Sequence, residues 1–235
     1  MFLFLKLILA HLVADFVLQF EELYRLKVKS LLGHIAHVLI HGIVTLLCLF
    51  PYLNELTIWL FVAGLMATHL IQDFIKYTLT KKIPKNTFVY FMIDQCFHLL
   101  VLSAIFLLPV SSDVRGFPNH LILNTLYTQS IWTVNAIFFL LLTFASSYTL
   151  FAFYQSYRKD ARPDHGITSL EIIYTSLERI LIGGIALFTP NLLWLLITPL
   201  IGLVRLPIVK MRDQKDFMFS LTFSIILGLF FRLFQ

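Results

Sequence analysis

Histidines and aspartates at helical spacing, inside apolar stretches, are the residues of this chain best suited to chemistry. Most of its eight histidines lie in such stretches. Each ionisable side chain in hydrocarbon costs roughly 2.5–3.5 kcal/mol on insertion scales, so a set of them needs a compensating role. A shared metal ion would supply one, and interhelical hydrogen bonding is the alternative. The candidate metal ligands are His11, Asp15, His34, His37, His41, His69, Asp73, Asp94 and His98.

The spacing of these residues predicts that each pair or stripe occupies one helix face. His11 and Asp15 are four residues apart, and His69 and Asp73 repeat that pattern. Side chains four apart on a helix have Cβ atoms about 5–6 Å from each other. The histidines of 34–41 follow an i, i+3, i+7 pattern and form a single stripe. Helical hairpins packed face to face would therefore bring these groups into one bundle core.

The donor types indicate which ion the site would take. Imidazole and carboxylate without cysteine suit zinc, with manganese or iron as alternatives. The candidates outnumber the three or four ligands of one catalytic zinc, so one or two ions are possible. Such a site activates water and polarises a carbonyl or phosphoryl oxygen. Lys76 and Gln95 are candidates for contacting an anionic substrate group. Glu178 is a further catalytic candidate. An equally supported alternative is that Glu178 forms a buried ion pair with an arginine and so stabilises the helix bundle.

Composition predicts an all-α, polytopic membrane bundle. The chain is 59% hydrophobic and 13% charged, with a mean hydropathy of +0.85, whereas soluble domains carry about 25% charged residues. A membrane helix needs about 20 apolar residues. That length predicts eight spans, near 2–20, 31–50, 56–77, 88–110, 131–154, 169–188, 191–208 and 217–234. They form a His/Asp-rich domain over 1–110, an external loop over 111–130 and a second four-helix half over 131–235.

Basic residues predict the orientation of these spans. Most of the 18 Lys and Arg residues lie in four alternate loops, which the positive-inside rule places in the cytoplasm. Both termini are then outside, and all candidate ligands lie in the cytoplasmic half of the membrane. This asymmetry accounts for the net charge of +5 without a nucleic-acid partner. Lys27 and Lys29 are expected to extend to the headgroups.

The same residues carry a resemblance to a known family. Four parts of the sequence resemble an uncharacterised family of bacterial multi-pass membrane proteins, of the domain of unknown function 3307 type. They are the segment His11–Gln19, the histidine stripe, the 69–76 segment and Asp94-Gln95-x-x-His98. The resemblance covers about the first 110 residues, and 177–179 resembles a motif of some longer relatives. It implies a location in the bacterial cytoplasmic membrane and supplies no activity. A more distant resemblance is to membrane-bound metal-dependent hydrolases.

These observations favour an intramembrane metal-dependent hydrolase. Its substrate would be a lipid-linked ester or phosphoester in the cytoplasmic leaflet, so its expected partner is a membrane lipid or a lipid-linked molecule. A metal-ion or proton-coupled transporter is the main alternative, and a structural or regulatory membrane subunit is another. The outer halves of the first four predicted spans carry almost no polar residues, which favours a closed site over a path across the membrane.

Overall fold

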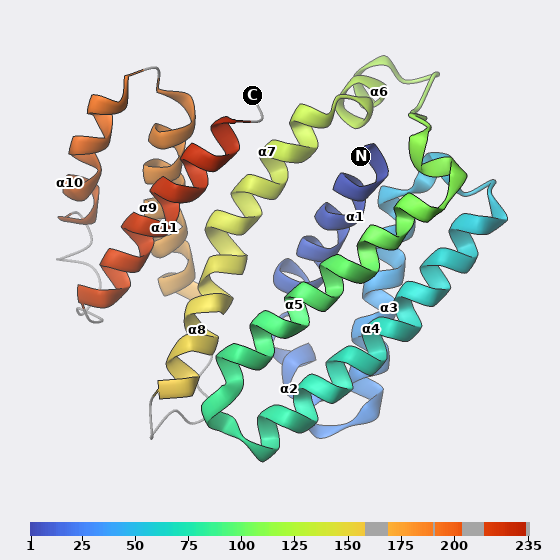
Figure 1. Ribbon diagram of the computed structural model, residues 1–235, viewed down its shortest axis with the longest axis horizontal. Coiled ribbons are helices and arrows are strands. Elements are labelled where there is room, and N and C mark those ends of the chain that lie inside the picture. The colour runs from blue at the N-terminus through green and yellow to red at the C-terminus, as the bar shows by residue number, and fades with distance from the viewer. Residues whose placement is uncertain (158–168, 190, 204–213, 234–235) are drawn as a thin grey trace. The chain divides into compact units, whose positions relative to one another are not determined.

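The computed structural model describes residues 1–157, 169–189, 191–203 and 214–233 (Figure 1). Within these ranges the chain is 88% helical and has no strand, which confirms the all-α class. Helices satisfy their backbone hydrogen bonds internally, as apolar segments in lipid require. The chain divides into two compact units, residues 1–137 with 152–161 and residues 138–151 with 162–235. The two units are described separately below.

The first unit consists of long helices joined by short turns. Three prolines begin 3-10 turns at Phe50–Tyr52, Pro84–Asn86 and Pro109–Ser112, where the fixed φ of proline suits a first helical turn. A fourth 3-10 turn covers Ala104–Leu107. The helices are α1 (Phe2–Leu12), α2 (Glu21–Lys29), α3 (Leu31–Cys48), α4 (Leu56–Lys82), α5 (Thr87–Ser103) and α6 (Leu121–Thr128). Helices α7 (Ser130–Leu140) and α8 (Ser146–Tyr157), joined by a π-turn at Leu141–Ala145, contribute residues to both units.

Two local features shape the chain between α1 and α3. A π-turn at Val13–Val17 continues α1, and the helix axis then bends by 85° into α2. The side chain of Ser30 caps α3 by accepting a hydrogen bond from the Gly33 amide at 3.3 Å. A Cβ on Gly33 would lie 2.3 Å from the Leu26 carbonyl carbon and the Lys27 nitrogen. The close approach of α2 to the start of α3 therefore requires glycine at this position.

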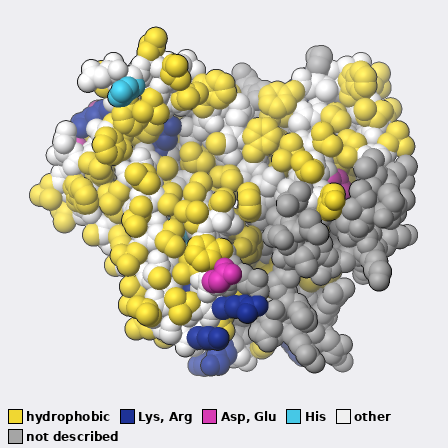
Figure 2. Space-filling model, turned by 180° about the vertical axis from the view of Figure 1, so that it is seen from behind, with side chains coloured by type: hydrophobic (Ala, Val, Ile, Leu, Met, Phe, Trp, Pro, Cys, Tyr) yellow, Lys and Arg dark blue, Asp and Glu magenta, His cyan; other side chains and the backbone are white. Residues whose placement is uncertain are grey.

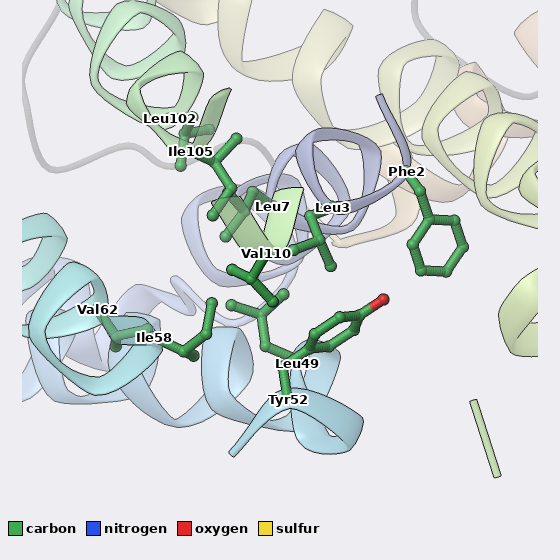
Figure 3. Close-up of a cluster of buried hydrophobic side chains, with 10 residues drawn as sticks. All are labelled: Phe2, Leu3, Leu7, Leu49, Tyr52, Ile58, Val62, Leu102, Ile105 and Val110. Atoms are coloured by element: carbon green, nitrogen blue, oxygen red, sulfur yellow. The ribbon is translucent and has the colours of Figure 1, made fainter. Parts of the chain in front are cut away.

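One end of the first unit is filled by apolar side chains, referred to below as the apolar cluster (Figure 3). Leu3 and Leu7 of α1 point toward Leu49 and Tyr52. The Tyr52 hydroxyl donates to the Asp113 carbonyl at 2.9 Å and accepts from the Arg115 amide at 2.8 Å. The cluster comprises Phe2, Leu3, Leu7, Leu49, Tyr52, Ile58, Val62, Leu102, Ile105 and Val110.

The outer faces of α3, α4 and α5 are strongly apolar. Leu32, Leu47, Leu60 and Leu100 are each about two-thirds exposed. Figure 2 shows hydrophobic side chains over much of one face, with Lys and Arg at the bottom and at the upper left of the view. A soluble protein seldom exposes so large a continuous apolar surface. This surface is the kind that lipid covers.

Four helical segments are long and apolar enough to cross a membrane: 31–48, 56–82, 84–107 and 130–156. Counting the bent pair at the N-terminus as one broken span raises the number to five among the described residues. The predicted total of eight is therefore not confirmed. The predicted span 191–208 begins as a 3-10 turn, Leu192–Ile197, followed by α10 (Thr198–Leu203), and its last residues lie outside the described ranges. The predicted loop 111–130 contains α6.

The second unit packs α9 (Ser169–Phe188) against α11 (Gln214–Arg232). A Cβ on Gly228 would lie 2.6 Å from the Ala186 Cβ and 2.7 Å from the Gly183 carbonyl oxygen, so small residues set the distance between these helices.

The guanidinium of Arg179 is buried in this unit. It donates to the hydroxyls of Ser146 (2.6 Å), Ser147 (2.8 Å) and Ser220 (3.1 Å).

Candidate metal centre

Four helices of the first unit carry the predicted ligands into its interior. His11 ends α1 and Asp15 lies in the π-turn, while the histidine stripe belongs to α3. Helix α4 supplies His69 and Asp73, and α5 supplies the reversed pair at 94 and 98. None of the nine predicted ligands is more than 8% exposed. The helical spacing thus places every one of them on an inward face.

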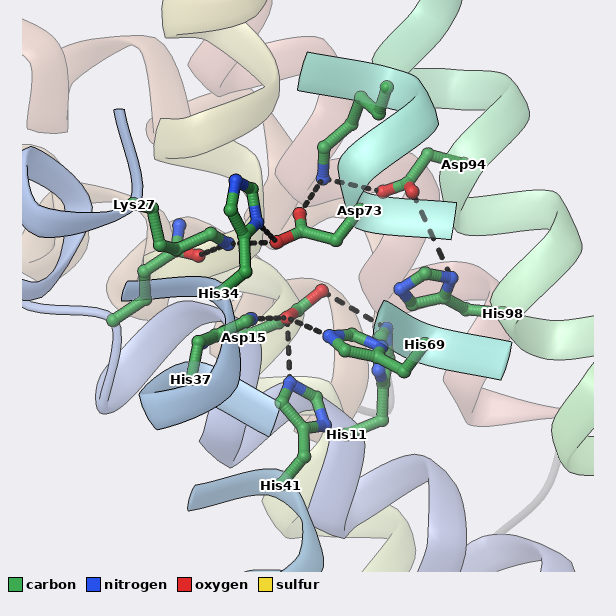
Figure 4. A network of polar contacts seen from close by, with 12 residues as sticks. His11, Asp15, Lys27, His34, His37, His41, His69, Asp73, Asp94 and His98 are labelled. Carbon is green, nitrogen blue, oxygen red and sulfur yellow. Dashed lines mark hydrogen bonds and ion pairs between the residues drawn. The ribbon is translucent and has the colours of Figure 1, made fainter. Parts of the chain in front are cut away.

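Four histidines surround the carboxylate of Asp15 and a fifth packs against two of them, and we call this group the imidazole cluster (Figure 4). Oδ1 of Asp15 lies 2.8 Å from Nε2 of His41 and 3.0 Å from Nε2 of His37, both within hydrogen-bonding distance. Nε2 of His69 is 3.8 Å from the same oxygen, and Nε2 of His11 is 3.6 Å from Oδ2. His98 completes the cluster, with ring centroids 4.4 Å from His69 and 4.8 Å from His11.

Within the imidazole cluster, four residues have the geometry of a metal site. One ligand atom each from His11, Asp15, His41 and His69 lies within 4.8 Å of the others, so the group could hold an ion. In tetrahedral zinc sites each ligand atom lies about 2.0–2.2 Å from the ion, so the ligand atoms are closer to one another than 4.8 Å. A small movement of these four side chains toward one another would therefore complete the coordination. All four side chains are buried, and they come from α1 with its π-turn, α3 and α4.

Unpartnered nitrogens give an independent sign that this group fits a metal. Nε2 of His69, one of the four residues, is buried without a hydrogen-bond partner among the described residues, and so are Nδ1 of His37 and both ring nitrogens of His98 beside the group. A buried polar atom without a partner costs about 1–3 kcal/mol. A neutral imidazole recovers that cost when its free lone pair binds an ion. The donor set of imidazoles and one carboxylate suits zinc, manganese or iron.

The other predicted ligands form a separate set of ion pairs, which we call the lysine–aspartate network. Oδ2 of Asp73 accepts from Nζ of Lys27 at 2.8 Å and from Nδ1 of His34 at 2.9 Å. Nζ of Lys76 lies 3.2 Å from Oδ1 of Asp73 and 2.8 Å from Oδ2 of Asp94. Two lysines thus neutralise two buried carboxylates. The structure places His34, Asp73 and Asp94 here and not around Asp15.

Gln95 joins the two groups. Its amide nitrogen donates to Oδ2 of Asp94 at 3.2 Å, and its Oε1 lies 3.3 Å from Nε2 of His11. Oδ1 of Asp94 has no hydrogen-bond partner among the described residues and lies 3.9 Å from Nδ1 of His98. Gln95 and Lys76 therefore orient Asp94 toward the imidazole cluster. Their contact with an anionic substrate group stays a prediction.

Lys27 corrects one expectation and is a residue that sequence reasoning missed. It was expected to extend to the headgroups, but it is 6% exposed and its Nζ binds both Asp73 and Oε1 of Gln19. The bend after the π-turn and the close approach at Gly33 direct it inward. No helical spacing in the sequence links Lys27 to Asp73.

A small cavity of about 30 Å³ adjoins the imidazole cluster. His11, His41, His69 and His98 line one part of it, so it touches three of the four metal-site residues. Apolar side chains line most of the rest. Leu7, Val62 and Leu102 belong both to this lining and to the apolar cluster, so the cavity ends against that cluster.

Glu178, the remaining catalytic candidate, lies in α9 of the second unit and is 6% exposed. It neighbours Arg179, whose hydroxyl partners belong to the same unit. Its role in catalysis stays a prediction.

Comparison with known proteins places the first unit in a family. Searches of curated proteins and of solved structures find no match. The sequence model of one family matches residues 3–123, just over half of the 235-residue chain, and this segment holds the imidazole cluster and the lysine–aspartate network. The chain therefore belongs to the family described as a protein of unknown function (DUF3307).

Proposed function

We propose that this chain is an integral membrane, metal-dependent hydrolase that acts on a lipid-linked ester or phosphoester. One observation carries the proposal: His11, Asp15, His41 and His69 converge within 4.8 Å in a buried position beside a cavity. The apolar outer faces of α3 to α5 support the membrane location. The predicted placement in the cytoplasmic membrane, with both termini outside, remains part of this proposal.

The contacts favour a single ion. His11, Asp15, His41 and His69 are the proposed ligands, and His37 orients Asp15 through its 3.0 Å contact. A ligand nitrogen must carry no proton, so ligation by Nε2 of His41 replaces its hydrogen bond to Asp15. A second ion would need carboxylates that already bind Lys27 and Lys76.

A divalent ion at this position polarises a carbonyl or phosphoryl oxygen and makes bound water acidic. The protein's own contribution is to hold the ligands and exclude bulk water. Asp94 is held by Lys76 and Gln95, and its Oδ1 lies 3.9 Å from Nδ1 of His98, beyond hydrogen-bonding distance. Lys76 and Gln95 are thus positioning residues in this proposal.

The apolar cluster favours chemistry over transport. The cavity beside the histidines ends against the apolar side chains of Leu7, Val62 and Leu102. A transported ion needs polar groups or water on both sides of its site. A site open to one side only is sufficient for a hydrolase.

Elemental analysis of the detergent-purified protein tests the metal site. We expect about one divalent transition-metal ion per chain in the wild type and almost none in His69→Ala, because the other ligands cannot close the site alone. Asp113→Asn is the control, since the Asp113 side chain is exposed and its ion pair is with Arg115, outside the candidate site. Equal metal content in all three proteins would contradict the proposal.

Turnover is tested on the same preparations. Chelation should abolish hydrolysis of lipid esters or phosphoesters, and zinc or manganese should restore it. Metal uptake into proteoliposomes without hydrolysis would support a transporter instead.

A further inference from the structure

The lining of the cavity distinguishes between the two substrate classes left open above. Apart from its histidines, the cavity is lined by the apolar residues Leu7, Val62, Leu65, Met66, Val101 and Leu102, with Gly42, Thr45, Thr68 and Gln72. Among the described residues, no Lys, Arg, Asp or Glu lines it. A ligand group that enters beside the imidazole cluster therefore meets apolar and hydroxyl groups.

The charges around the cavity disfavour a phosphate there. The two nearby lysines, the buried Lys27 and the half-buried Lys76, already bind Asp73 and Asp94 at 2.8 Å. A phosphodiester or phosphomonoester oxygen would meet no cationic side chain there, so its desolvation cost would be offset by the bound ion alone. An uncharged ester carbonyl carries no such cost. The cavity thus suits an acyl group better than a phosphoryl group.

The size of the cavity limits the acyl chain. A volume of about 30 Å³ has room for about two water-sized groups. Met66 restricts it: a Cβ built on Gly42 would lie 2.5 Å from the Met66 sulfur, so this thioether fills the space over Gly42. Met66 therefore forms the wall of the cavity over Gly42.

The half-buried part of the lining shows where a membrane substrate would enter. Leu65, Met66, Thr68 and Gln72 of α4 and Val101 of α5 are the lining residues that keep some exposure. The neighbouring outer faces of these helices carry exposed apolar residues such as Ile71 and Leu100. Entry between α4 and α5 would let an ester reach the cavity directly from lipid.

We propose that the cavity binds the short, uncharged acyl group of an ester, with its carbonyl toward the imidazole cluster and Met66 limiting its length. This inference rests on the proposed hydrolase function and names the substrate class of the same site. In the hydrolysis, the oxygen of water bonds to the acyl carbon and the ester C–O bond breaks. The carboxylic acid and the alcohol leave, and the alcohol oxygen takes a proton from the water.

Cobalt-substituted protein in detergent gives a test that does not depend on turnover. The visible absorption of bound Co²⁺ reports the metal site, and its change on titration reports ligand affinity. The probes are aceto-, butyro- and octanohydroxamate, which mimic acyl groups of increasing length, and methyl-, propyl- and heptylphosphonate as anionic counterparts. Acetohydroxamate and butyrohydroxamate should bind at least about tenfold more tightly than the phosphonates and octanohydroxamate.

Variants at the cavity wall locate the effect. Met66→Ala should raise the affinity for octanohydroxamate by about tenfold, since it lengthens the cavity. Gly42→Ala, whose methyl group presses on Met66, should weaken butyrohydroxamate binding by a similar factor. Met92→Ala is the matched control, because Met92 is 41% exposed on α5 and does not line the cavity. An unchanged Co²⁺ spectrum in the absence of probe shows that each variant is folded.

The outcomes separate this inference from the proposed function. Failure of the protein to bind Co²⁺ overturns the metal site itself. A normal Co²⁺ spectrum with equal affinity for all chain lengths, or with tighter binding of phosphonates, overturns the acyl-group inference alone. A length preference that Met66→Ala leaves unchanged overturns the role of Met66.

Discussion

The imidazole cluster and the lysine–aspartate network both contain an aspartate four residues after a histidine, but the two aspartates have different neighbours. Asp15 faces His37 and His41 at 3.0 and 2.8 Å, with no lysine in contact. Asp73 faces Lys27 and Lys76 at 2.8 and 3.2 Å. A carboxylate paired with lysines is electrostatically satisfied, whereas one that contacts only imidazoles still attracts a metal cation. The residues around a motif thus decide whether its carboxylate serves binding or stability.

Removing the charge of Asp15 should have the largest effect. Asp15→Asn takes away the only carboxylate of the metal group, so we expect metal affinity to fall by more than about a hundredfold. Competition with a chromophoric chelator would measure this change. Asp73→Asn should leave the affinity of the folded protein within about tenfold of wild type. Equal losses in the two variants would show that both aspartates serve one site.

Asp73→Asn should instead destabilise the protein. Buried Lys27 would lose its carboxylate partner, which costs about 3–5 kcal/mol, while half-buried Lys76 would keep its pair with Asp94. Unfolding in mixed detergent micelles, followed by circular dichroism, measures the loss. The double variant Lys27→Met/Asp73→Asn should recover part of it, because one unpaired charge is removed. A double variant less stable than Asp73→Asn would contradict the pairing.

Gly33→Ala tests whether the network depends on the position of α2. The added methyl group would lie 2.3 Å from the Leu26 carbonyl carbon, so α2 must move and Lys27 must leave Asp73. We expect a loss of about 1–3 kcal/mol. Gly64→Ala is the control, since no atom lies within 4 Å of its Cβ position, and it should be neutral or slightly stabilising. Similar losses in both variants would point to a general intolerance of alanine in these helices.

Gln95→Leu should have the smallest effect and tests the link between the two groups. The side chain contacts Asp94 and His11 at 3.2 and 3.3 Å, and each such bond contributes about 0.5–1.5 kcal/mol. We expect a modest loss of stability together with a metal affinity lowered by about tenfold. Micelle unfolding and chelator competition on the same sample measure both. A change in only one of them would show that the two groups act independently.

Helical spacing was sufficient to predict the inward faces but not their division into two groups. The patterns at 11/15, 34–41, 69/73 and 94/98 correctly indicated which side chains share a face, because that depends only on helix geometry. The partners of Asp73 depend on Lys27, whose direction comes from the bend after Val17 and the close approach at Gly33. These are tertiary features without a local sequence signal. The apolar composition likewise predicted membrane-type helices, while the number of spans depends on breaks such as the 3-10 turn at 192–197.

The Lys27–Asp73 pair also bears on how the proposed membrane protein is made. Lys27 lies before α3 and Asp73 near the end of α4, so the ribosome releases the cation first. At about 5–20 residues per second, several seconds pass before the anion follows. A lysine without its partner is poorly accepted in lipid during that interval. The early segments would therefore wait at the translocon or the lipid surface, and α1 to α4 would enter the bilayer as one concerted unit.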